Sequence, residues 1–370
     1  MRRSRAALLL LVPLLVAACA TGGGTATSKD SVAGALTPEA GCEGYGVSAA
    51  PGGPVARCAP GAPAPKPLVQ PATIVMNMPT GFEFAAPWYW AKEHGEFEKE
   101  NLTVEIQNLP SADAYTLTAQ GRIDFACSGP NAPMYNAIAQ GFDIKWVTGS
   151  IATPASSKSG LWARKGTSLA DLQGKVIASA AGPGSASLYP VDRMLTAAGG
   201  GDLSGDTVKT VSGPDMQQAL EAGAIDAGIF LDPRWVPLEQ SGNFEFLGST
   251  TPPGESLLGC IAGPSFYAKR DAAVAFLRAV SRTVNTTFAG DYHADPAVVA
   301  DVARMMGTTP AELVKTPSPV FDLLVRTNTS EPLQQTYRKT NALQYSEILP
   351  DDRVVDRTLL EEAHGVRFGS

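Results

Sequence analysis

The residues best suited to hold a ligand follow predicted strands, because an α/β sheet places its binding side chains at the carboxyl ends of its strands. A glycine-rich turn between a predicted strand and a predicted helix reads Ala180-Ala-Gly-Pro-Gly-Ser-Ala-Ser-Leu-Tyr189. Gly184 would let the backbone approach a ligand, and Ser185 would begin the helix at its positive dipole end, with Tyr189 in the first turn. The turn predicts an anion-binding site, although a tight turn with a capping serine has the same composition.

Two other predicted strands are followed by residues that could contact a ligand. Thr80, Phe82 and Trp88 come after the first strand, where the aromatic rings could line a pocket or pack in the core. Ser128 ends the third strand just before a helix. Its hydroxyl could bind an anionic or carbonyl group, cap the helix, or do both.

Asp232 and Arg234 follow a further predicted strand in the second half of the chain. The carboxylate of Asp232 would face a cleft from the strand end and could receive an amine. Arg234 could bind a carboxylate or a sulfonate, but a surface salt bridge would suit it equally well. These two side chains favour ligands of opposite charge, so the ligand class stays open at this point.

Chemistry beyond binding has little support in the sequence. There is no Cys-x-x-Cys pair, and His94, His293 and His364 have no ligand-like partners nearby, so we expect no metal. The Gly-x-Ser-x-Gly elbow of hydrolases and the terminal Gly-Lys-Ser/Thr of a phosphate loop are both absent. We therefore expect a binding protein with no catalytic residues and no cofactor.

Strands and helices alternate regularly from residue 72 onward. Apolar runs of strand length, such as 73–78 and 102–106, are followed by amphipathic stretches that end in glycine. The series starts again at about Gly160, and residues 272–363 are mainly helical. This alternation predicts parallel α/β sheets covered by helices on both faces.

A short internal sequence repeat, here called the internal echo, favours two lobes of similar structure. The stretch Leu117-Thr-Ala-Gln-Gly-Arg-Ile-Asp124 is nearly matched by Leu220-Glu-Ala-Gly-Ala-Ile-Asp226. Both stretches would join the end of a helix to a strand. The length of 370 residues also exceeds that of a typical single domain, so two packed domains are expected.

The N-terminus has the pattern of an export signal. Three arginines precede an uncharged, mostly apolar run from Ala6 to Ala18, which is too short to span a bilayer as a helix. The run Val16-Ala-Ala-Cys19 resembles the lipobox of a bacterial lipoprotein. This resemblance implies that residues 1–18 are removed and that Cys19 is lipidated. The alternative is an ordinary cleaved signal with an incidental cysteine.

Composition and cysteine content bound the rest of the chain. Residues 19–71, rich in small residues and proline, are expected to form a flexible tether. Removal of the signal changes the formal charge from 29 − 36 = −7 to 26 − 36 = −10, which argues against a nucleic-acid partner. Cys42 and Cys58 could close a small loop as a disulfide. Cys127 and Cys260 could be free thiols in a core, the commoner state of isolated buried cysteines, and the sequence does not decide whether they pair.

Four runs, in order along residues 72–290, follow the pattern of a known family. In the first of them, Asn101 replaces the usual glycine, which is a conservative change for a left-handed turn. The four runs are 91–105, 119–126, 168–177 and 216–227. The chain thereby resembles the substrate-binding proteins of bacterial ABC importers, in particular those for nitrate, taurine, aliphatic sulfonates and thiamine pyrimidine precursors.

The resemblance implies an α/β fold of the periplasmic-binding-protein type II class, with a discontinuous lobe 1 and a hinge of two crossovers. Lobe 1 would comprise residues 72–157 and 254–366, and lobe 2 residues 158–253. It implies a receptor, expected to be a monomer, that closes on a small organic solute and delivers it to ABC permease subunits. Lipid on Cys19 would anchor it to the outer face of the cell membrane.

Two other functions share this architecture. An enzyme related to thiamine-pyrimidine synthesis would use a histidine, pyridoxal phosphate and a cysteine-rich iron motif. This chain has no clustered cysteines, and its three histidines lie outside the predicted cleft. A solute sensor that works without a transporter would have the same fold and the same tether.

Overall fold

The structure is a computed structural model. The expected signal peptide, Cys19, most of the expected tether, Cys42, Cys58 and Ser128 lie outside the residues that it describes. None of the described helices is long and apolar enough to cross a membrane. The described residues are 62–127, 129–152, 154, 156–251, 257–325 and 330–365.

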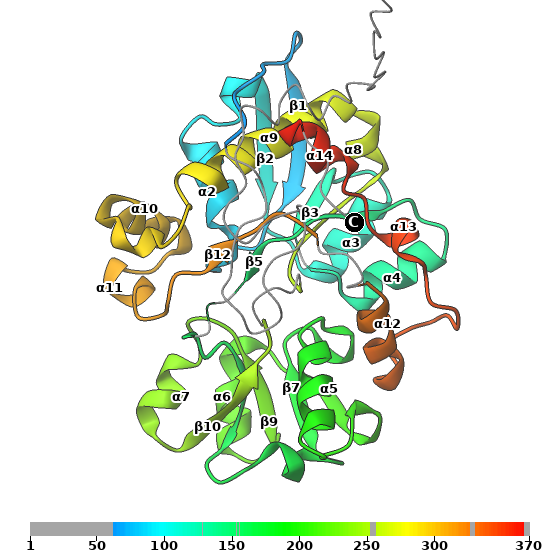
Figure 1. Ribbon diagram of the computed structural model, residues 1–370, viewed down its shortest axis with the longest axis vertical. Coiled ribbons are helices and arrows are strands. Elements are labelled where there is room, and N and C mark those ends of the chain that lie inside the picture. The colour runs from blue at the N-terminus through cyan, green and yellow to red at the C-terminus, as the bar shows by residue number, and fades with distance from the viewer. Residues whose placement is uncertain are drawn as a thin grey trace, which may run out of the picture.

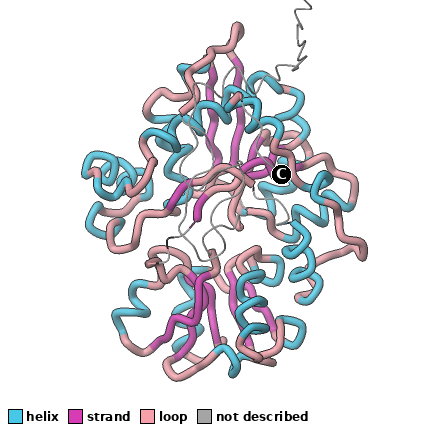
Figure 2. The backbone as a smooth tube through the Cα atoms, in the orientation of Figure 1, coloured by secondary structure: helices cyan, strands magenta, loops and turns pink. Residues whose placement is uncertain are grey.

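Two five-stranded sheets form the centres of two bodies, which lie one above the other in Figures 1 and 2. The upper body, lobe 1, has the strand order β2-β1-β3-β11-β4, and the lower body, lobe 2, has the order β10-β6-β9-β7-β8. A short pair, β5 and β12, accompanies them. The strands are β1 (Ala72–Asn77), β2 (Leu102–Gln107), β3 (Phe125–Cys127), β4 (Lys145–Thr148), β5 (Ile151–Ala152), β6 (Gly160–Arg164), β7 (Val176–Ser179), β8 (Thr207–Thr210), β9 (Ala227–Phe230), β10 (Phe244–Ser249), β11 (Cys260–Ala262) and β12 (Val320–Phe321).

Helices surround both sheets, and the long helix α9 crosses the sheet of lobe 1 in Figure 1. The α-helices are α2 (Ala86–Glu93), α3 (Ser111–Ala119), α4 (Ala132–Ala139), α5 (Leu188–Ala197), α6 (Gly213–Glu221), α7 (Val236–Ser241), α8 (Pro264–Ala268), α9 (Arg270–Thr286), α10 (Pro296–Met306), α11 (Pro310–Leu313), α12 (Ser330–Lys339), α13 (Asp351–Val354) and α14 (Thr358–His364). The short 3-10 helices used below are η1 (Glu83–Ala85), η4 (Gly182–Gly184) and η5 (Leu203–Gly205).

The chain passes between the lobes twice. It leaves the sheet of lobe 1 after β4, forms the whole sheet of lobe 2 from β6 to β10, and returns as β11. Lobe 1 is therefore discontinuous, as expected, while the exact boundary residues stay a prediction. The expectation of parallel sheets was wrong in part, because β11 is antiparallel to β3 and β4, and β6 is antiparallel to β9 and β10. A strand that enters a sheet from the other lobe starts where its neighbours end, so it runs against them.

The central strands of each sheet, such as β3, β9 and β11, are buried on both faces, as expected for a sheet covered by two layers. Phe125 belongs to one apolar cluster of lobe 1 and its neighbour Ala126 to the other. Leu161 and Trp162 divide in the same way between the two clusters of lobe 2. Each lobe therefore has its own core, and Ala186 of lobe 2 also packs in one cluster of lobe 1.

The internal echo has a structural role in both lobes. The carboxylate of Asp124 accepts the backbone N–H of Val75 in β1 at 2.8 Å. Asp226, its counterpart, accepts the backbone N–H of Val176 in β7 at 3.0 Å. In each case the aspartate fixes the start of one strand against its neighbour, so the repeated Ile-Asp pair is explained by strand pairing.

The segment before β1 is held in lobe 1 by a buried carboxylate. Glu100 is fully buried and accepts hydrogen bonds from Arg278 at 2.9 and 3.0 Å and from Arg282 at 2.8 Å. The same carboxylate accepts the backbone N–H of Lys66, whose carbonyl accepts a bond from Arg278. Residues near Lys66, which were expected to belong to the tether, are therefore held against lobe 1.

A disulfide joins Cys127 in β3 to Cys260 in β11. The two residues lie directly opposite each other in the antiparallel pair, and both are buried. The sequence left open whether these cysteines are free thiols or a pair, and the structure has them paired. Their sequence separation of 133 residues hides the contact, since only the return of the chain from lobe 2 brings the two strands together.

Replacing both cysteines, Cys127→Ala with Cys260→Ala, should lower the free energy of unfolding by about 3–5 kcal/mol, because the cross-link closes a long loop of the unfolded chain. Urea unfolding with and without a reductant measures this. The reductant should destabilise the wild type more than the double variant. Equal sensitivity of both proteins to the reductant would contradict the pairing.

Candidate functional site

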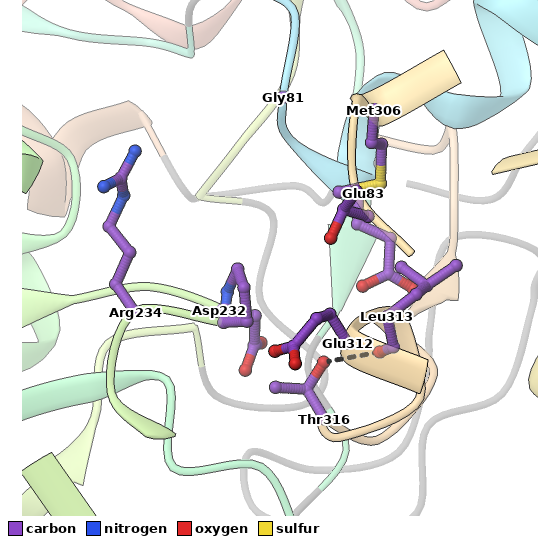
Figure 3. Close-up of a pocket in the computed structure, with 10 residues that line it drawn as sticks. Gly81, Glu83, Asp232, Arg234, Met306, Glu312, Leu313 and Thr316 are labelled. Atoms are coloured by element: carbon purple, nitrogen blue, oxygen red, sulfur yellow. Dashed lines mark hydrogen bonds between the residues drawn. The ribbon is translucent and has the colours of Figure 1, made fainter. Parts of the chain in front are cut away.

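A cavity of about 240 Å³ lies between the lobes and has walls from three parts of the chain (Figure 3). Glu83 comes from η1 in lobe 1, and Asp232 comes from the turn after β9 in lobe 2. This volume lies below the roughly 300–1,000 Å³ of pockets for drug-sized ligands, so the cavity suits a small solute. The remaining lining residues are Gly81, Pro233, Arg234 and, from the region of α10 and α11, Met306, Thr308, Glu312, Leu313 and Thr316.

A second, smaller cavity of about 30 Å³ adjoins the same two carboxylates. Glu83 and Asp232 line both cavities, and the rest of the second lining is mostly apolar. The two carboxylates thus lie where the cavities meet. The other residues of the second lining are Phe82, Phe84, Ile151, Ser159, Leu231, Thr251, Leu258 and Pro319.

Asp232 is a half-buried carboxylate whose described hydrogen bonds come from neutral donors. The hydroxyl of Ser157 lies 3.2 Å from each carboxylate oxygen, and the indole N–H of Trp235 donates to Oδ1. Burial raises the pKa of Asp232 from its ordinary value of 3.8 to about 6, and the negative charge of Glu83 adds to this rise against the two hydrogen bonds. The site therefore holds a carboxylate at a cost in free energy.

Glu83, on the opposite wall, has partners of a different kind. Its carboxylate accepts a hydrogen bond from the hydroxyl of Tyr292 and lies 2.8 Å from Nε2 of His293. Burial and the charge of Glu83 raise the pKa of Tyr292, which keeps this phenol protonated as a donor. His293 was expected to lie outside the cleft, but it lies directly behind one of the cavity's carboxylates.

The two other charged residues of the larger cavity, Arg234 and Glu312, are exposed. Arg234 is exposed and lies beside Gly213 at the start of α6, and its guanidinium extends away from Asp232 in Figure 3. Glu312 forms an exposed ion pair with Lys315 at 2.6 Å. Exposed pairs of this kind contribute little, so Asp232 and Glu83 dominate the electrostatics of the interior.

The opposite side of the interface between the lobes is closed by direct contacts. The side chain of Asn131 accepts the backbone N–H of Ala186 at 3.0 Å. A Cβ atom at Gly184 would lie 2.8 Å from the Cβ atom of Ala132, so only glycine fits there. This contact between η4 and the start of α4 brings the two lobes together without space for a ligand between these residues.

Helix α12 bridges the lobes on the same side. It packs against α4 and α13 of lobe 1 and against α5 and η5 of lobe 2, and it lies between the two bodies in Figure 1. Lys339 at its end pairs with Asp192 at 2.7 Å and with Asp202 at 3.2 Å, both in lobe 2. The hydroxyl of Thr340 donates to the carbonyl of Pro183 at 2.6 Å.

Buried polar atoms without partners gather near the strand ends of lobe 1. Asn77 and Thr148 are the last residues of β1 and β4, and Ser150 and Thr250 lie in the crossovers. One side-chain atom of each has no hydrogen-bond partner in the part of the chain that the structure describes. Such an atom costs about 1–3 kcal/mol, so water or ligand at this edge would be stabilising.

Only some of the residues that the sequence predicted for the site line the two cavities. The structure brings Phe82, Asp232 and Arg234 to the cavities. Thr80 is exposed and accepts a hydrogen bond from Asn108, while Trp88 is buried in the core of lobe 1 and lines neither cavity.

The glycine-rich turn also differs from its expected role as an anion site. Ser185 does not begin a helix, because α5 starts at Leu188. Gly184 and Ser185 are buried at the contact between the lobes, and Tyr189 packs against the lobe 1 cluster and under Arg193. The backbone N–H that follows Ser185 is already used by the other lobe.

Sequence reasoning missed Glu83, Glu312 and His293. Glu83 lies between Phe82 and Trp88, which were proposed from the sequence as pocket residues. Its position after the first strand was the signal that could have identified it as a site residue. Nothing local marks Glu312 or His293, since the C-terminal helices have no recognisable motif. No group of three or more metal-ligating side chains occurs among the described residues.

Comparison with known proteins assigns the chain to a family. The sequence pattern of a family described as NMT1/THI5 like matches residues 84–291, which is more than half of the chain. The chain belongs to the NMT1/THI5-like family. The NMT1/THI5-like match includes Asp232 and the whole sheet of lobe 2, but it ends before α10 and α11, which form one wall of the cavity. Among curated proteins, none matches this NMT1/THI5-like chain.

Solved structures share the two-lobed fold. The alkanesulfonate-binding protein SsuA from Xanthomonas axonopodis pv. citri, bound to MOPS, has a TM-score of 0.59 and 18% identity over 78% of this chain and 99% of its own. SsuA from Escherichia coli has a TM-score of 0.58 and 18% identity over 80% and 99%. The nitrate-binding protein NrtA from Synechocystis PCC 6803 has a TM-score of 0.54 and 14% identity over 80% and 89%. The NMT1/THI5-like chain therefore has the periplasmic-binding-protein fold.

Asp232→Asn should stabilise the unliganded NMT1/THI5-like protein by about 2 kcal/mol at pH 7.5, because it removes a poorly compensated carboxylate. Between pH 4 and pH 6 the folded wild type binds more protons at Asp232 than the unfolded chain does. Its stability from this group therefore falls as the pH rises, and the advantage of the variant should shrink below pH 6 and vanish only below the ordinary pKa of 3.8. Urea unfolding at pH 7.5 and below pH 6 measures the difference.

Asp226→Asn provides the matched comparison in the same lobe. Asp226 accepts the N–H of Val176 and lies 3.6 Å from Arg164, so its replacement should destabilise the protein. A loss of stability in Asp232→Asn as large as that in Asp226→Asn would contradict the prediction.

Proposed function

We propose that this protein is an extracytoplasmic receptor that binds a small organic solute between its lobes and delivers it to an ABC importer. The observation that carries the proposal is the cavity between the lobes, with Glu83 of lobe 1 and Asp232 of lobe 2 on its walls. A ligand that contacts both lobes favours their closed arrangement, which is the form that a permease would bind. The SsuA and NrtA structures, which are described as binding proteins, support this reading through their fold.

The proposed location is the outer face of the cell membrane. The signal at residues 1–18 directs export, and a lipidated Cys19 would anchor the protein through the tether. The disulfide between Cys127 and Cys260 is an independent argument, because disulfides persist mainly in oxidising compartments.

Binding without reaction fits the groups at the cavity. Asp232 and Glu83 have hydrogen-bond partners that hold them in place, and the lining contains no serine or cysteine nucleophile with a histidine beside it among the described residues. The receptor would hold its solute and release it unchanged.

Native mass spectrometry of the freshly purified protein, followed by calorimetric titration, tests the proposed function. We expect a carried-over small molecule, or binding of a solute from a panel of amines, sulfonates and pyrimidines, with a Kd in the micromolar range. This corresponds to about −8 kcal/mol, which a few hydrogen bonds and apolar contacts supply. Conversion of any bound compound into a product would instead favour an enzyme.

Lys339→Ala should loosen the closed side of the interface between the lobes. A partly buried ion pair contributes about 1 kcal/mol, so the amide of Ala186, which donates across the interface, should exchange with solvent about fivefold faster. Hydrogen exchange of the unliganded protein followed by NMR measures this.

Lys99→Ala is the matched control, because Lys99 pairs with Glu96 inside lobe 1. It should leave the exchange of the Ala186 amide unchanged. Equal exchange rates in the wild type and in Lys339→Ala would show that the ion pair has no part in holding the lobes together.

A further inference from the structure

The lining of the cavity is acidic at the point where both lobes meet. Three carboxylates and one guanidinium line the larger cavity, which gives a formal charge of −3 + 1 = −2 at neutral pH. The guanidinium of Arg234 is exposed and extends away from Asp232, so it does not neutralise that carboxylate (Figure 3).

Two buried carboxylates of lobe 1, Glu100 and Asp124, have cationic partners. Glu100 is paired with two arginines at 2.8–3.0 Å, and Asp124 is paired with Lys269 at 2.9 Å. Asp232 is bonded only by a hydroxyl and an indole N–H, and no ion pair to it is found in the described part of the chain. A half-buried charge without a cation is costly, which points to a cation that is supplied from outside.

The two cavities beside Asp232 indicate what kind of cation would fit there. Its carboxylate lies between a cavity of about 240 Å³ and a smaller apolar one lined by Phe82, Phe84 and Leu258. The rings of Phe82 and Phe84 stack with centroids 5.6 Å apart. A ligand with a charged head and an apolar body would fill both parts of the site.

On this basis we propose that the solute is a small organic cation, a protonated amine with an apolar body, whose ammonium group binds between Asp232 and Glu83. The inference rests on the proposed function and specifies its ligand class. Asp232 is then the principal counter-ion, because the charge of Glu83 is shared with His293 and Tyr292. A sulfonate or nitrate would instead lie against two carboxylates, so anions should be rejected.

Matched probes with the same hydrocarbon body test the charge preference. 2-Phenylethylamine, 2-phenylethanesulfonate and 2-phenylethanol form one set, and propylamine, propanesulfonate and propanol form a smaller one. Calorimetric titration at pH 7.5 should show an amine binding at least tenfold more tightly than the sulfonate and the alcohol of its set. A charge-assisted hydrogen bond accounts for a difference of this size.

Asp232→Asn should weaken amine binding about 10- to 100-fold and should not weaken sulfonate binding. Asp206→Asn is the matched control, since Asp206 is a partly buried aspartate of lobe 2 that accepts the N–H of Gly174 and lines neither cavity. It should leave amine affinity within twofold of the wild type. Equal losses in both variants would overturn the inference.

The pH dependence of the wild type gives a second test that does not depend on the folding of a variant. Burial raises the pKa of Asp232 to about 6, so amine affinity should fall about tenfold between pH 7 and pH 5 as its carboxylate is protonated. An affinity that is unchanged over this range would contradict the role of Asp232. The other charged groups around the site are Glu83 with His293, Arg234, and Glu312 with Lys315.

The outcomes separate the inference from the function on which it rests. Tight binding of a sulfonate or an alcohol, or an anionic molecule identified by native mass spectrometry, would overturn the cation preference and leave the receptor function standing. Failure of every probe to bind, with no carried-over ligand, would count against both.

Discussion

The central strands of each sheet are buried on both faces mainly by side chains of their own lobe, so the lobes can meet mainly through the ends of their strands and the segments that follow them. This constraint places polar residues at the interface, because strand ends and turns carry the backbone and side-chain groups that a core excludes. Asp232 follows β9, Glu83 follows β1, and both line the same cavity. The separation of the two cores therefore creates the site, and the two crossovers keep its walls together.

The buried or partly buried carboxylates of this protein differ in their hydrogen-bond partners, and this difference indicates which of them could bind a charged ligand. Glu100 is fully buried with two arginines and a backbone N–H, so it fixes lobe 1 and has no capacity left. Asp124 and Asp226 each hold the start of a strand. Asp232 has neutral donors only, and burial raises its pKa to about 6. Stability alone would favour a neutral residue at this position, and perturbed groups of this kind concentrate at functional sites.

The local patterns of the sequence predicted most of the elements, because apolar periodicity and glycine stops are local signals. The helix α10, for example, begins at Pro296 and ends at Met306 as its pattern indicates. What the sequence could not provide were contacts made by the return of the chain from lobe 2. The bond between Cys127 and Cys260, the antiparallel course of β11 and the position of Glu312 at the cavity all depend on that return. Asp232 could be proposed because it directly follows a strand.

The glycine-rich turn shows how the same sequence feature can have a different role when the lobes close. Glycines allow close approach of the backbone, and at Gly184 the close neighbour is Ala132 of the other lobe. The N–H of Ala186, which could have bound an anion, donates to Asn131. With α12 packed against both lobes on this side, the remaining space lies at the other side, next to Asp232 and Glu83. The contact between the lobes thus uses a backbone N–H group that would suit an anion, and the cavity is lined by carboxylates, which would suit the proposed cationic ligand.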